Sequence, residues 1–171
     1  MVKLEHERNN FGGIWHSDTT YLAEPPMGSM LLAREVPPCG GDTMFANQYL
    51  AYEALSDGLK QALDGLVGVS SSVKAEVTKT REDRLKAAGA EHKVLSAEHP
   101  IVRRHPETGR KCLFVNHSYT CRFDGMTERE SRPLLEFLMD HGHRPEFTCS
   151  FRWEPGSIAF WDNRCTKHLA V

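Results

Sequence analysis

Two histidines and one aspartate are the residues of this chain whose types and spacing could do chemistry. His16 and Asp18 are separated by a single residue, and His168 lies near the other end of the chain. Two imidazoles and one carboxylate on one face of a metal are the ligand set of mononuclear non-haem iron(II) sites, and they leave positions open for a second acid and for O₂. If the three side chains converge, they predict an oxygen-activating metal centre.

The same pair of residues also fits a structure without metal. His16 could be a strand histidine that bonds a neighbour, with Asp18 solvated at a turn, and the H-x-D spacing alone does not separate the two interpretations. His117 has nothing in its surroundings to distinguish it from a surface histidine. The remaining histidines lie in loops or charged segments, and we expect them to be solvated: His6, His92, His99, His105, His141 and His143.

Length and composition are those of an ordinary globular chain. With 171 residues, 40% of them apolar, residues 1–171 are expected to form a single domain with a real core. A net charge of −2 gives no electrostatic case for nucleic acid or an anionic membrane, and no apolar run approaches the ~20 residues of a membrane helix. Five scattered cysteines without a C-x-x-C pair favour reduced thiols and a cytoplasmic location.

Strands are predicted near both ends, where they would carry the candidate ligands. Residues 14–22 are rich in Trp, Thr and Tyr, and side chains two apart on a strand share a face, so His16 and Asp18 would project together. A Pro- and Gly-rich loop is expected at residues 37–42. Further strands are expected at residues 28–36 (a buried one), 43–46, 147–153 and 157–161, and a β-hairpin at residues 100–106 and 111–116.

Helices are predicted between these strands. Leucines at positions 55, 59, 63 and 66 fall on one helix face within residues 47–66, with Ser56 as the N-cap of a second short helix and Gly65 as a stop. Thr127 and Glu130 form a capping box for a helix to about His141. Pro133 conflicts with that start, and a start at Ser131 is the other option. Residues 73–95 are expected to be a surface excursion of the kind that covers active sites.

Strands around a small helical insertion predict a mainly β fold, a β-sandwich or jelly roll, in which an early and a late strand lie side by side. Four ordered segments strengthen this: WHSDTTY at residues 15–21, the prolines at 25–26, GGDT at 40–43 and WDNRCTKH at 161–168. In this order they resemble the taurine dioxygenase (TauD/TfdA) family of Fe(II)- and 2-oxoglutarate-dependent dioxygenases. The resemblance covers nearly the whole chain and implies a double-stranded β-helix with helical insertions.

The resemblance also implies roles for individual residues. His16, Asp18 and His168 match the family's metal ligands and would be the catalytic residues, and Thr43 matches a threonine that helps hold the far carboxylate of 2-oxoglutarate. Tyr119 falls where the family places an aromatic side chain against the substrate, and Trp161 resembles an aromatic near the iron. Each of the last three also fits a plain structural role: Thr43 as a strand threonine, Tyr119 and Trp161 as packing aromatics.

The reaction implied is hydroxylation of a small, anionic organic substrate by O₂, with release of succinate and CO₂. A homodimer or homotetramer is implied as well. The family's arginine that pairs with 2-oxoglutarate lies ten to fifteen residues beyond the distal histidine, and the chain ends at Val171. We therefore expect a fragment that lacks its N-terminal part and last strand. The alternative is a catalytically silent jelly-roll module in which the same three residues hold zinc or nothing.

Overall fold

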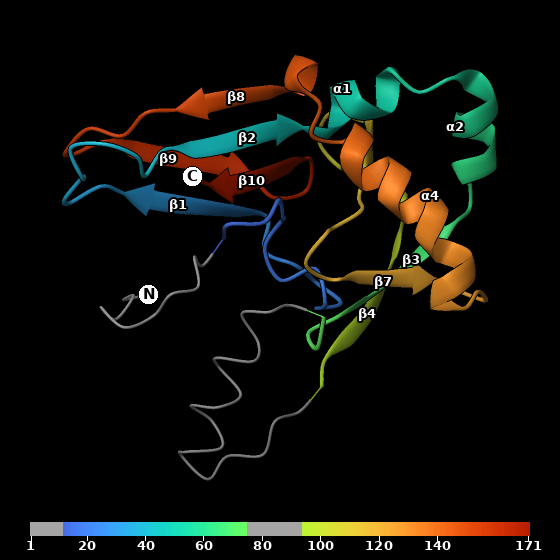
Figure 1. The fold of residues 1–171 in the computed structure, drawn as a ribbon. Helices are drawn as coiled ribbons and strands as arrows, with labels where there is room; N and C mark the ends of the chain where they lie inside the picture. The colour runs from blue at the N-terminus through green and yellow to red at the C-terminus, as the bar shows by residue number, and fades with distance from the viewer. Residues whose placement is uncertain (1–11, 75–93) are drawn as a thin grey trace, which may run out of the picture.

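Strands predominate in the computed structural model, which describes residues 12–74 and 94–171 (Figure 1). The strands are β1 Gly28–Leu32, β2 Thr43–Asn47, β3 Val67–Ser71, β4 Ser96–Pro100, β5 Val102–Arg104, β6 Lys111–Leu113, β7 Thr120–Phe123, β8 Thr148–Phe151, β9 Ile158–Asp162 and β10 Thr166–Ala170. The helices are α1 Gln48–Glu53, α2 Asp57–Leu63 and α4 Glu128–His141, followed by the short 3₁₀ helix η1 Pro145–Phe147. The fold is therefore mostly β with few helices, as the sequence predicted.

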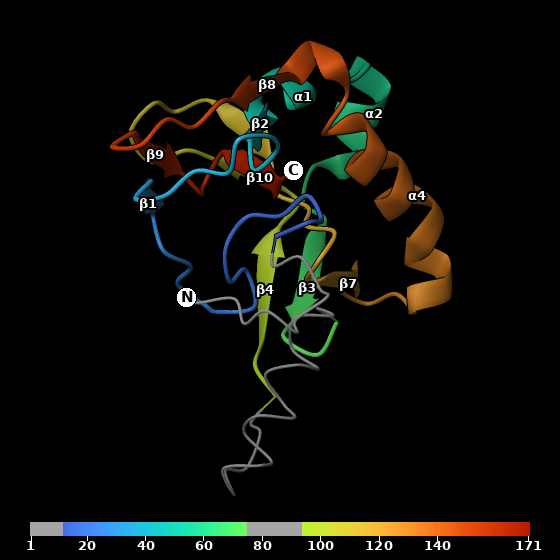
Figure 2. The same ribbon diagram turned by 60° about the vertical axis from the view of Figure 1, so that its left-hand side comes forward.

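Early and late strands lie side by side in antiparallel pairs. β2 lies between β10 and β8, and β1 pairs with β9. β3 lies between β4 and β7, and β5 and β6 form a hairpin. In Figures 1 and 2 the first two sheets occupy one side of the molecule, while the three helices lie on the other side above β3 and β7. The doubling back of the chain thus brings residues near both ends of the sequence to one place.

The strand predicted for residues 14–22 is wrong. Only His16 makes a β-bridge there, to His168, and the chain then turns. Thr19 has a φ of 46°, a left-handed conformation that is rare for a β-branched residue and incompatible with a strand. The amide of Leu22 donates to the carbonyl of Thr19 at 3.0 Å and closes the turn. A composition rich in β-formers did not reveal this reversal.

The strand predicted at residues 28–36 forms, but it is shorter and it is exposed. β1 ends at Leu32, and its side chains pair across to β9, with Met30 opposite Phe160 and Leu32 opposite Ile158. These four side chains are more than half exposed. The prediction that the strand is buried was wrong. An apolar run indicates that a strand forms, but it does not show whether another element covers that strand.

The leucine pattern of residues 47–66 is shared between two short helices. The side chain of Ser56 accepts the Leu59 N–H as the predicted N-cap, and α2 ends at Leu63, just before Gly65 with its φ of 82°. Leu55 and Leu63 are buried in one core, with Leu59 and Leu66 packed against it. The predicted apolar face and the second short helix that begins after Ser56 are both confirmed.

Helix α4 begins directly after Thr127, so the capping box decides between the two predicted starts. The Thr127 side chain accepts the Glu130 N–H, and the Glu130 carboxylate accepts the Thr127 N–H. Pro133 lies inside the helix, where its ring removes one backbone donor. Both Pro133 and Arg129, four residues before it, are exposed, so water can bond the carbonyl that is left unpaired.

The other predicted strands and the predicted loop form, with shifted ends. β2, β8, β9 and the β5–β6 hairpin form where strands were expected, and residues 37–42 form a loop. Strands β3, β4, β7 and β10 were not predicted. Most of the excursion expected at residues 73–95 lies outside the described residues.

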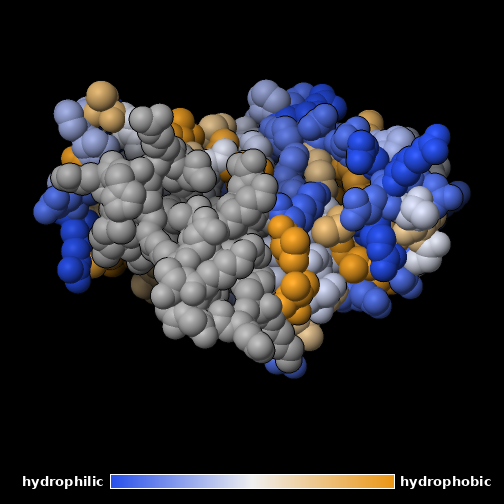
Figure 3. All heavy atoms as spheres, turned by 60° about the horizontal axis from the view of Figure 1, so that its bottom comes forward, coloured by the Kyte–Doolittle hydropathy of each residue, from blue (hydrophilic) through white to orange (hydrophobic). Residues whose placement is uncertain are grey.

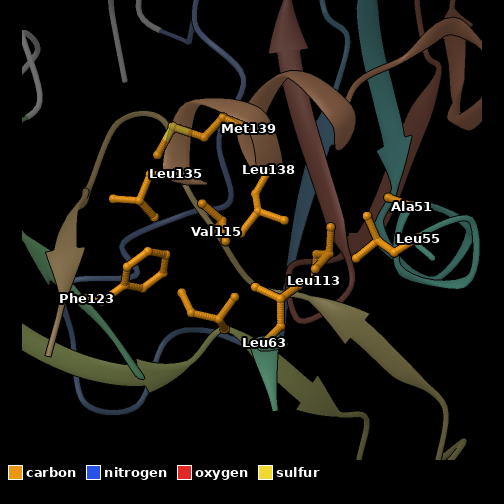
Figure 4. Close-up of a cluster of buried hydrophobic side chains, with 10 residues drawn as sticks. Ala51, Leu55, Leu63, Leu113, Val115, Phe123, Leu135, Leu138 and Met139 are labelled. Atoms are coloured by element: carbon orange, nitrogen blue, oxygen red, sulfur yellow. The ribbon is translucent and has the colours of Figure 1, made fainter. Parts of the chain in front are cut away.

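The largest buried cluster fills the space between α4, the two short helices and the neighbouring strands. Figure 4 shows Phe123 of β7 facing Leu135 of α4, with Leu113, Val115 and Leu138 continuing the cluster toward α1. On the face drawn in Figure 3, the coloured side chains are mostly hydrophilic, with scattered hydrophobic ones. No helix in residues 12–74 or 94–171 is both long and apolar enough to cross a membrane.

Candidate metal centre

His16, Asp18 and His168 converge in the structure, although the sequence separates them widely. One ligand atom from each lies within 4.8 Å of the others. The Nε2 atoms of His16 and His168 each lie 3.6 Å from Oδ1 of Asp18. Such separations are too long for hydrogen bonds, and cis ligands about 2.1 Å from a metal lie about 3 Å apart. The three atoms are thus spaced to surround a cation after a small contraction.

The bond made by its other ring nitrogen fixes the tautomer of His16. Nδ1 of His16 lies 2.7 Å from the carbonyl oxygen of Ile14. A carbonyl only accepts, so Nδ1 carries the proton and the lone pair of Nε2 faces Asp18. Metal-binding histidines are commonly held by such an outer bond. His16 is therefore oriented to bind a metal through Nε2.

His168 is held by packing instead. Its Nδ1 is buried and has no hydrogen-bond partner in the described residues. Its ring lies 4.8 Å from the ring of Trp161 and 6.5 Å from that of Phe45, measured between centroids. Burial, together with the neighbouring His16, lowers the pKa of His168 to about 4. His168 is thus neutral at neutral pH, which is the form that binds a metal.

Backbone pairing sets the two imidazoles side by side. The amide of His16 donates to the carbonyl of His168 at 3.0 Å, and the amide of His168 donates back at 2.8 Å. The ring centroids are 4.1 Å apart. Gly12, which precedes His16 in the chain, has a φ of 88°, and a Cβ at this position would lie 3.3 Å from Cε1 of His16. The bridge to β10 therefore replaces the predicted strand as the element that positions His16.

The turn that carries Asp18 is clamped by a buried asparagine. Nδ2 of Asn116 donates to the carbonyl of Ser17 at 2.7 Å and lies 3.3 Å from Oγ1 of Thr20. The hydroxyl of Ser17 donates to the carbonyl of Thr166 at 2.8 Å. These bonds fix a segment without regular structure on both sides of Asp18. Asn116 thus holds the backbone of this turn through side-chain hydrogen bonds, as pairing with a neighbouring strand holds the backbone of a regular strand.

Thr43 lies on the face of β2 that carries Phe45, whose partner across the sheet is His168. Alternate residues of a strand share a face, so Thr43 faces the same side as the distal histidine. The indole N–H of Trp153 donates to Oγ1 of Thr43 at 3.0 Å. Because the hydroxyl oxygen receives that bond, its proton is free to be donated elsewhere. The structure thus leaves Thr43 able to donate to a carboxylate, the role that the family resemblance implies for it.

The two predicted aromatic residues differ in how they contact the candidate ligands. Trp161 is 8% exposed and packs against His168 and Phe45. The ring of Tyr119 meets Tyr21 edge-on at 5.0 Å, three residues beyond Asp18. Trp161 therefore walls the candidate metal centre directly, whereas Tyr119 reaches it through the Asp18–Tyr21 turn.

Several histidines expected to be solvated are buried. His99, His105 and His141 are 5–8% exposed, and each has a polar partner. Nε2 of His141 lies 2.7 Å from the carbonyl of Ala51, and Nε2 of His99 lies 2.9 Å from that of Thr20. His143 and His117 are half-buried. The prediction that they are solvated was wrong because the charge of the surrounding segment does not determine which residues pack against a histidine in the fold. His6 and His92 lie outside the described residues.

A second group of candidate ligands in the described chain is His105, Asp162 and Cys165. Nε2 of His105 lies 3.1 Å from Oδ2 of Asp162, while its Nδ1 accepts the backbone N–H groups of Glu107 and Thr108. Both ring nitrogens are therefore occupied. His105 therefore offers no free lone pair to a metal, and the contacts of this group are those of a structural hydrogen-bond network.

A third group consists of His117, Asp140 and His143. The Asp140 side chain is 80% exposed. Burial and then the charge of the buried Lys167 lower the pKa of His117 to about 3. A lysine that raises the cost of positive charge at His117 also opposes a metal cation there. The set of His16, Asp18 and His168 is thus the best candidate among the three.

Two residues at the centre were missed by the sequence analysis, Ser29 and Asn163. Asn163 is 2% exposed and follows β9 directly, and Ser29 lies opposite Trp161 in β1. Both bond the Asp18 side chain. Asn163 lies in the segment WDNRCTKH at residues 161–168, but the sequence did not show that its side chain is buried. Nothing in the sequence singled out Ser29.

Comparisons with known proteins show which family this chain resembles. The family described as "Taurine catabolism dioxygenase TauD, TfdA family" matches residues 3–171. An alkylsulfatase from Acinetobacter baylyi is 36% identical over 177 aligned residues, which cover 100% of this chain and 55% of that protein. The crystal structure of a taurine dioxygenase from Burkholderia xenovorans shares 46% identity over 91% of this chain and 51% of its own, with a TM-score of 0.76.

A further structure, AAD-2 in complex with Mn(II) and N-oxalylglycine, has a TM-score of 0.79 at 31% identity and covers 94% of this chain and 62% of its own. The chain spans little more than half of the length of each of these relatives. Because the family match runs over residues 3–171 and the strands superpose on those of solved relatives, the chain belongs to the TauD/TfdA family of dioxygenases.

Proposed function

We propose that this chain carries the metal centre of an Fe(II)- and 2-oxoglutarate-dependent dioxygenase. The observation that carries the proposal is the convergence of two imidazole nitrogens and one carboxylate oxygen at His16, His168 and Asp18. Two nitrogens and one oxygen from the protein suit Fe(II) and leave coordination positions for other molecules. The pose of His168 also fits, since packing holds its ring with Nε2 toward Oδ1 of Asp18.

The residues of the chain would contribute binding, orientation and exclusion of water. His16, Asp18 and His168 would hold the iron, and Thr43 would donate its hydroxyl proton to the far carboxylate of 2-oxoglutarate. Trp161 and Phe45 cover the His168 side of the centre with apolar surface, which keeps water away. When bound, Fe(II) with 2-oxoglutarate supplies the activation of O₂, one oxygen atom of which goes to succinate, with loss of CO₂, and the other to a substrate C–H bond.

The proposed substrate is a small, anionic organic molecule. Relatives of this chain include proteins named for sulfate ester and 2,4-dichlorophenoxyacetate dioxygenase activities, and these names support that class. Tyr119 would contact this substrate from the Tyr21 side of the centre. We further propose one domain over residues 1–171 with a double-stranded β-helix, a homodimeric or homotetrameric assembly and a cytoplasmic location.

The test is anaerobic addition of Fe(II) and 2-oxoglutarate to the protein, followed by visible absorption. We expect a weak charge-transfer band in the wild type and none in His16→Ala, because that variant loses one imidazole ligand. His143→Ala, which changes a histidine outside the three, should keep the band. With substrate and O₂, His16→Ala should release no succinate, and normal succinate release by this variant would contradict the assignment.

The competing function is a silent binding module. Tight zinc binding by the wild type, with no band on addition of Fe(II) and 2-oxoglutarate, would favour that module. Both outcomes are measured on the same protein sample, so the experiment decides between them.

A further inference from the structure

The second carboxylate oxygen of Asp18 is held by two side chains, one from β1 and one from the residue directly after β9. Oδ2 accepts the hydroxyl proton of Ser29 and lies 3.4 Å from Nδ2 of Asn163. Nδ2 of Asn163 also donates to Oγ of Ser29 at 2.8 Å. Because Ser29 receives that bond, its single proton is left for Asp18. Oδ1, the other oxygen, is the atom that faces both imidazole Nε2 atoms.

The amide of Asn163 has one orientation that satisfies its neighbours. Its Oδ1 accepts the indole N–H of Trp161 at 3.1 Å and lies 3.5 Å from the backbone nitrogen of Asp18. An indole nitrogen only donates, so a flipped amide would set N–H against N–H in a buried site. Asn163 and Trp161 are 2% and 8% exposed, so water does not replace these bonds. The indole therefore fixes the amide so that Nδ2 of Asn163 faces the Asp18 carboxylate.

We propose that Asn163 and Ser29 are positioning residues that hold Asp18 in a single-oxygen metal-binding orientation; this inference rests on the proposed function. A carboxylate whose Oδ2 is bonded to two donors offers only Oδ1 to a cation. Rotation into a two-oxygen mode would break both bonds and would use a coordination position that the 2-oxo acid or O₂ needs. Trp161 acts through Asn163, in addition to packing on His168.

The test measures metal affinity without turnover. Mn(II) alone is titrated into the protein, and free Mn(II) is read by electron paramagnetic resonance. We expect Ser29→Ala and Asn163→Ala to raise the dissociation constant about 10- to 100-fold, the usual effect of losing an outer bond to a metal ligand. Ser29→Thr retains a hydroxyl and should restore affinity to near the wild-type value.

The matched control is Ser131→Ala. Ser131 is fully buried, and its hydroxyl bonds the Phe123 N–H and the Thr127 carbonyl far from the ligands. This variant should lower the melting temperature as Ser29→Ala does, and leave Mn(II) affinity unchanged. A merely structural role for Ser29 and Asn163 would give the same result as Ser131→Ala, and that outcome would overturn the inference.

The two levels of proposal fail in different ways. A wild type that binds Mn(II) while both variants bind it equally well removes the positioning role and leaves the metal centre intact. A wild type that binds no Mn(II), or binds it equally after His168→Ala, contradicts the metal centre itself and the positioning role with it.

Discussion

At the scale of single residues, the candidate centre depends on bonds made by atoms that face away from the metal position. His16 uses Nδ1 to bond the carbonyl of Ile14, and Asp18 uses Oδ2 to bond Ser29. Nδ1 of His168 has no hydrogen-bond partner in the described residues, and its ring packs against Trp161 and Phe45. The orientation of the ligands is thus decided by outer contacts, and two of the three ligands are fixed by hydrogen bonds before any metal arrives.

Thr43 provides a test at this scale. We expect Thr43→Ala to weaken binding of 2-oxoglutarate to the Fe(II)-loaded protein about 10-fold or more, since a hydrogen bond to a charged group contributes about 1.5–3 kcal/mol. Thr43→Ser keeps the hydroxyl and should bind nearly as the wild type does. The measurement is an anaerobic titration of 2-oxoglutarate followed by visible absorption. Equal affinity in all three proteins would mean that Thr43 serves only as an acceptor for Trp153.

At the scale of elements, short pieces of structure are specified by their caps more firmly than by their composition. Ser56 and Thr127 each begin a helix as N-cap, as the sequence predicted. Residues 14–22 had the composition of a strand and do not form one, because the turn at Thr19 is held by contacts from outside the segment. A cap is a local hydrogen bond, whereas the clamp on that turn comes from Asn116.

The N-cap of α4 gives a prediction for this element. Thr127→Ala should lower the free energy of unfolding by about 1 kcal/mol, because it removes the side-chain bond to the Glu130 N–H. Thr127→Ser keeps the cap and should be close to the wild type. Urea denaturation at neutral pH measures the difference. If Thr127→Ser lost as much stability as Thr127→Ala, the threonine methyl group would matter more than the cap.

The capping box also predicts a pH dependence. Bonds from the backbone and side chain of Thr127 lower the pKa of Glu130 below its ordinary value. A carboxyl group whose pKa is lowered by folding stabilises the folded state above its unfolded pKa, and this effect is lost as the pH falls through the folded pKa. Thr127→Ala should therefore differ less from the wild type in acid than at neutral pH, as urea denaturation at several pH values would show.

At the scale of the whole molecule, charged groups at the end of β9 join it to the β5–β6 hairpin. Burial raises the pKa of Asp162, but bonds from Arg164 and His105 outweigh it and hold the pKa at about 2, below the ordinary 3.8. Arg164 also bonds Glu107 at 3.0 Å. The sequence adjacent to the candidate centre thus ties two sheets together.

The contacts of Asp162 with Arg164 and His105 predict how the stability of the protein changes with pH. Because the unfolded chain binds a proton at Asp162 more readily than the folded one, the stabilisation is complete above about pH 4 and is lost as the pH falls toward 2. Asp162→Asn should lower the free energy of unfolding by about 1–2 kcal/mol at neutral pH, and the difference should vanish near pH 2.

A matched variant checks the size of this effect. Asp64 makes an exposed ion pair with Lys111 at 3.5 Å, and its side chain is 74% exposed. Asp64→Asn should change stability by at most about 0.5 kcal/mol, because exposed ion pairs are screened by water. If both variants behave alike in thermal denaturation across pH, the contacts of Asp162 contribute no more to stability than an ordinary surface ion pair.

The sequence by itself determined whatever depends on neighbours along the chain. The caps at Ser56 and Thr127, the hairpin around residues 107–109 and the strands β2, β8 and β9 follow from local hydrogen bonds, turn residues and periodicity, and all were predicted. The three candidate ligands were named from residue type and spacing together with the ordered segments around them. Each of these signals lies within a few residues of the feature that it predicts.

Only the tertiary structure decided what surrounds those residues. The burial of His99, His105 and His141, the exposure of β1 and the turn at Thr19 each depend on partners far away in the sequence. The same holds at the candidate centre, where Ser29 and Asn163 reach Asp18 through the pairing of β1 with β9. The chain therefore names its candidate ligands locally, but the contacts that orient them come from segments that meet only when it folds.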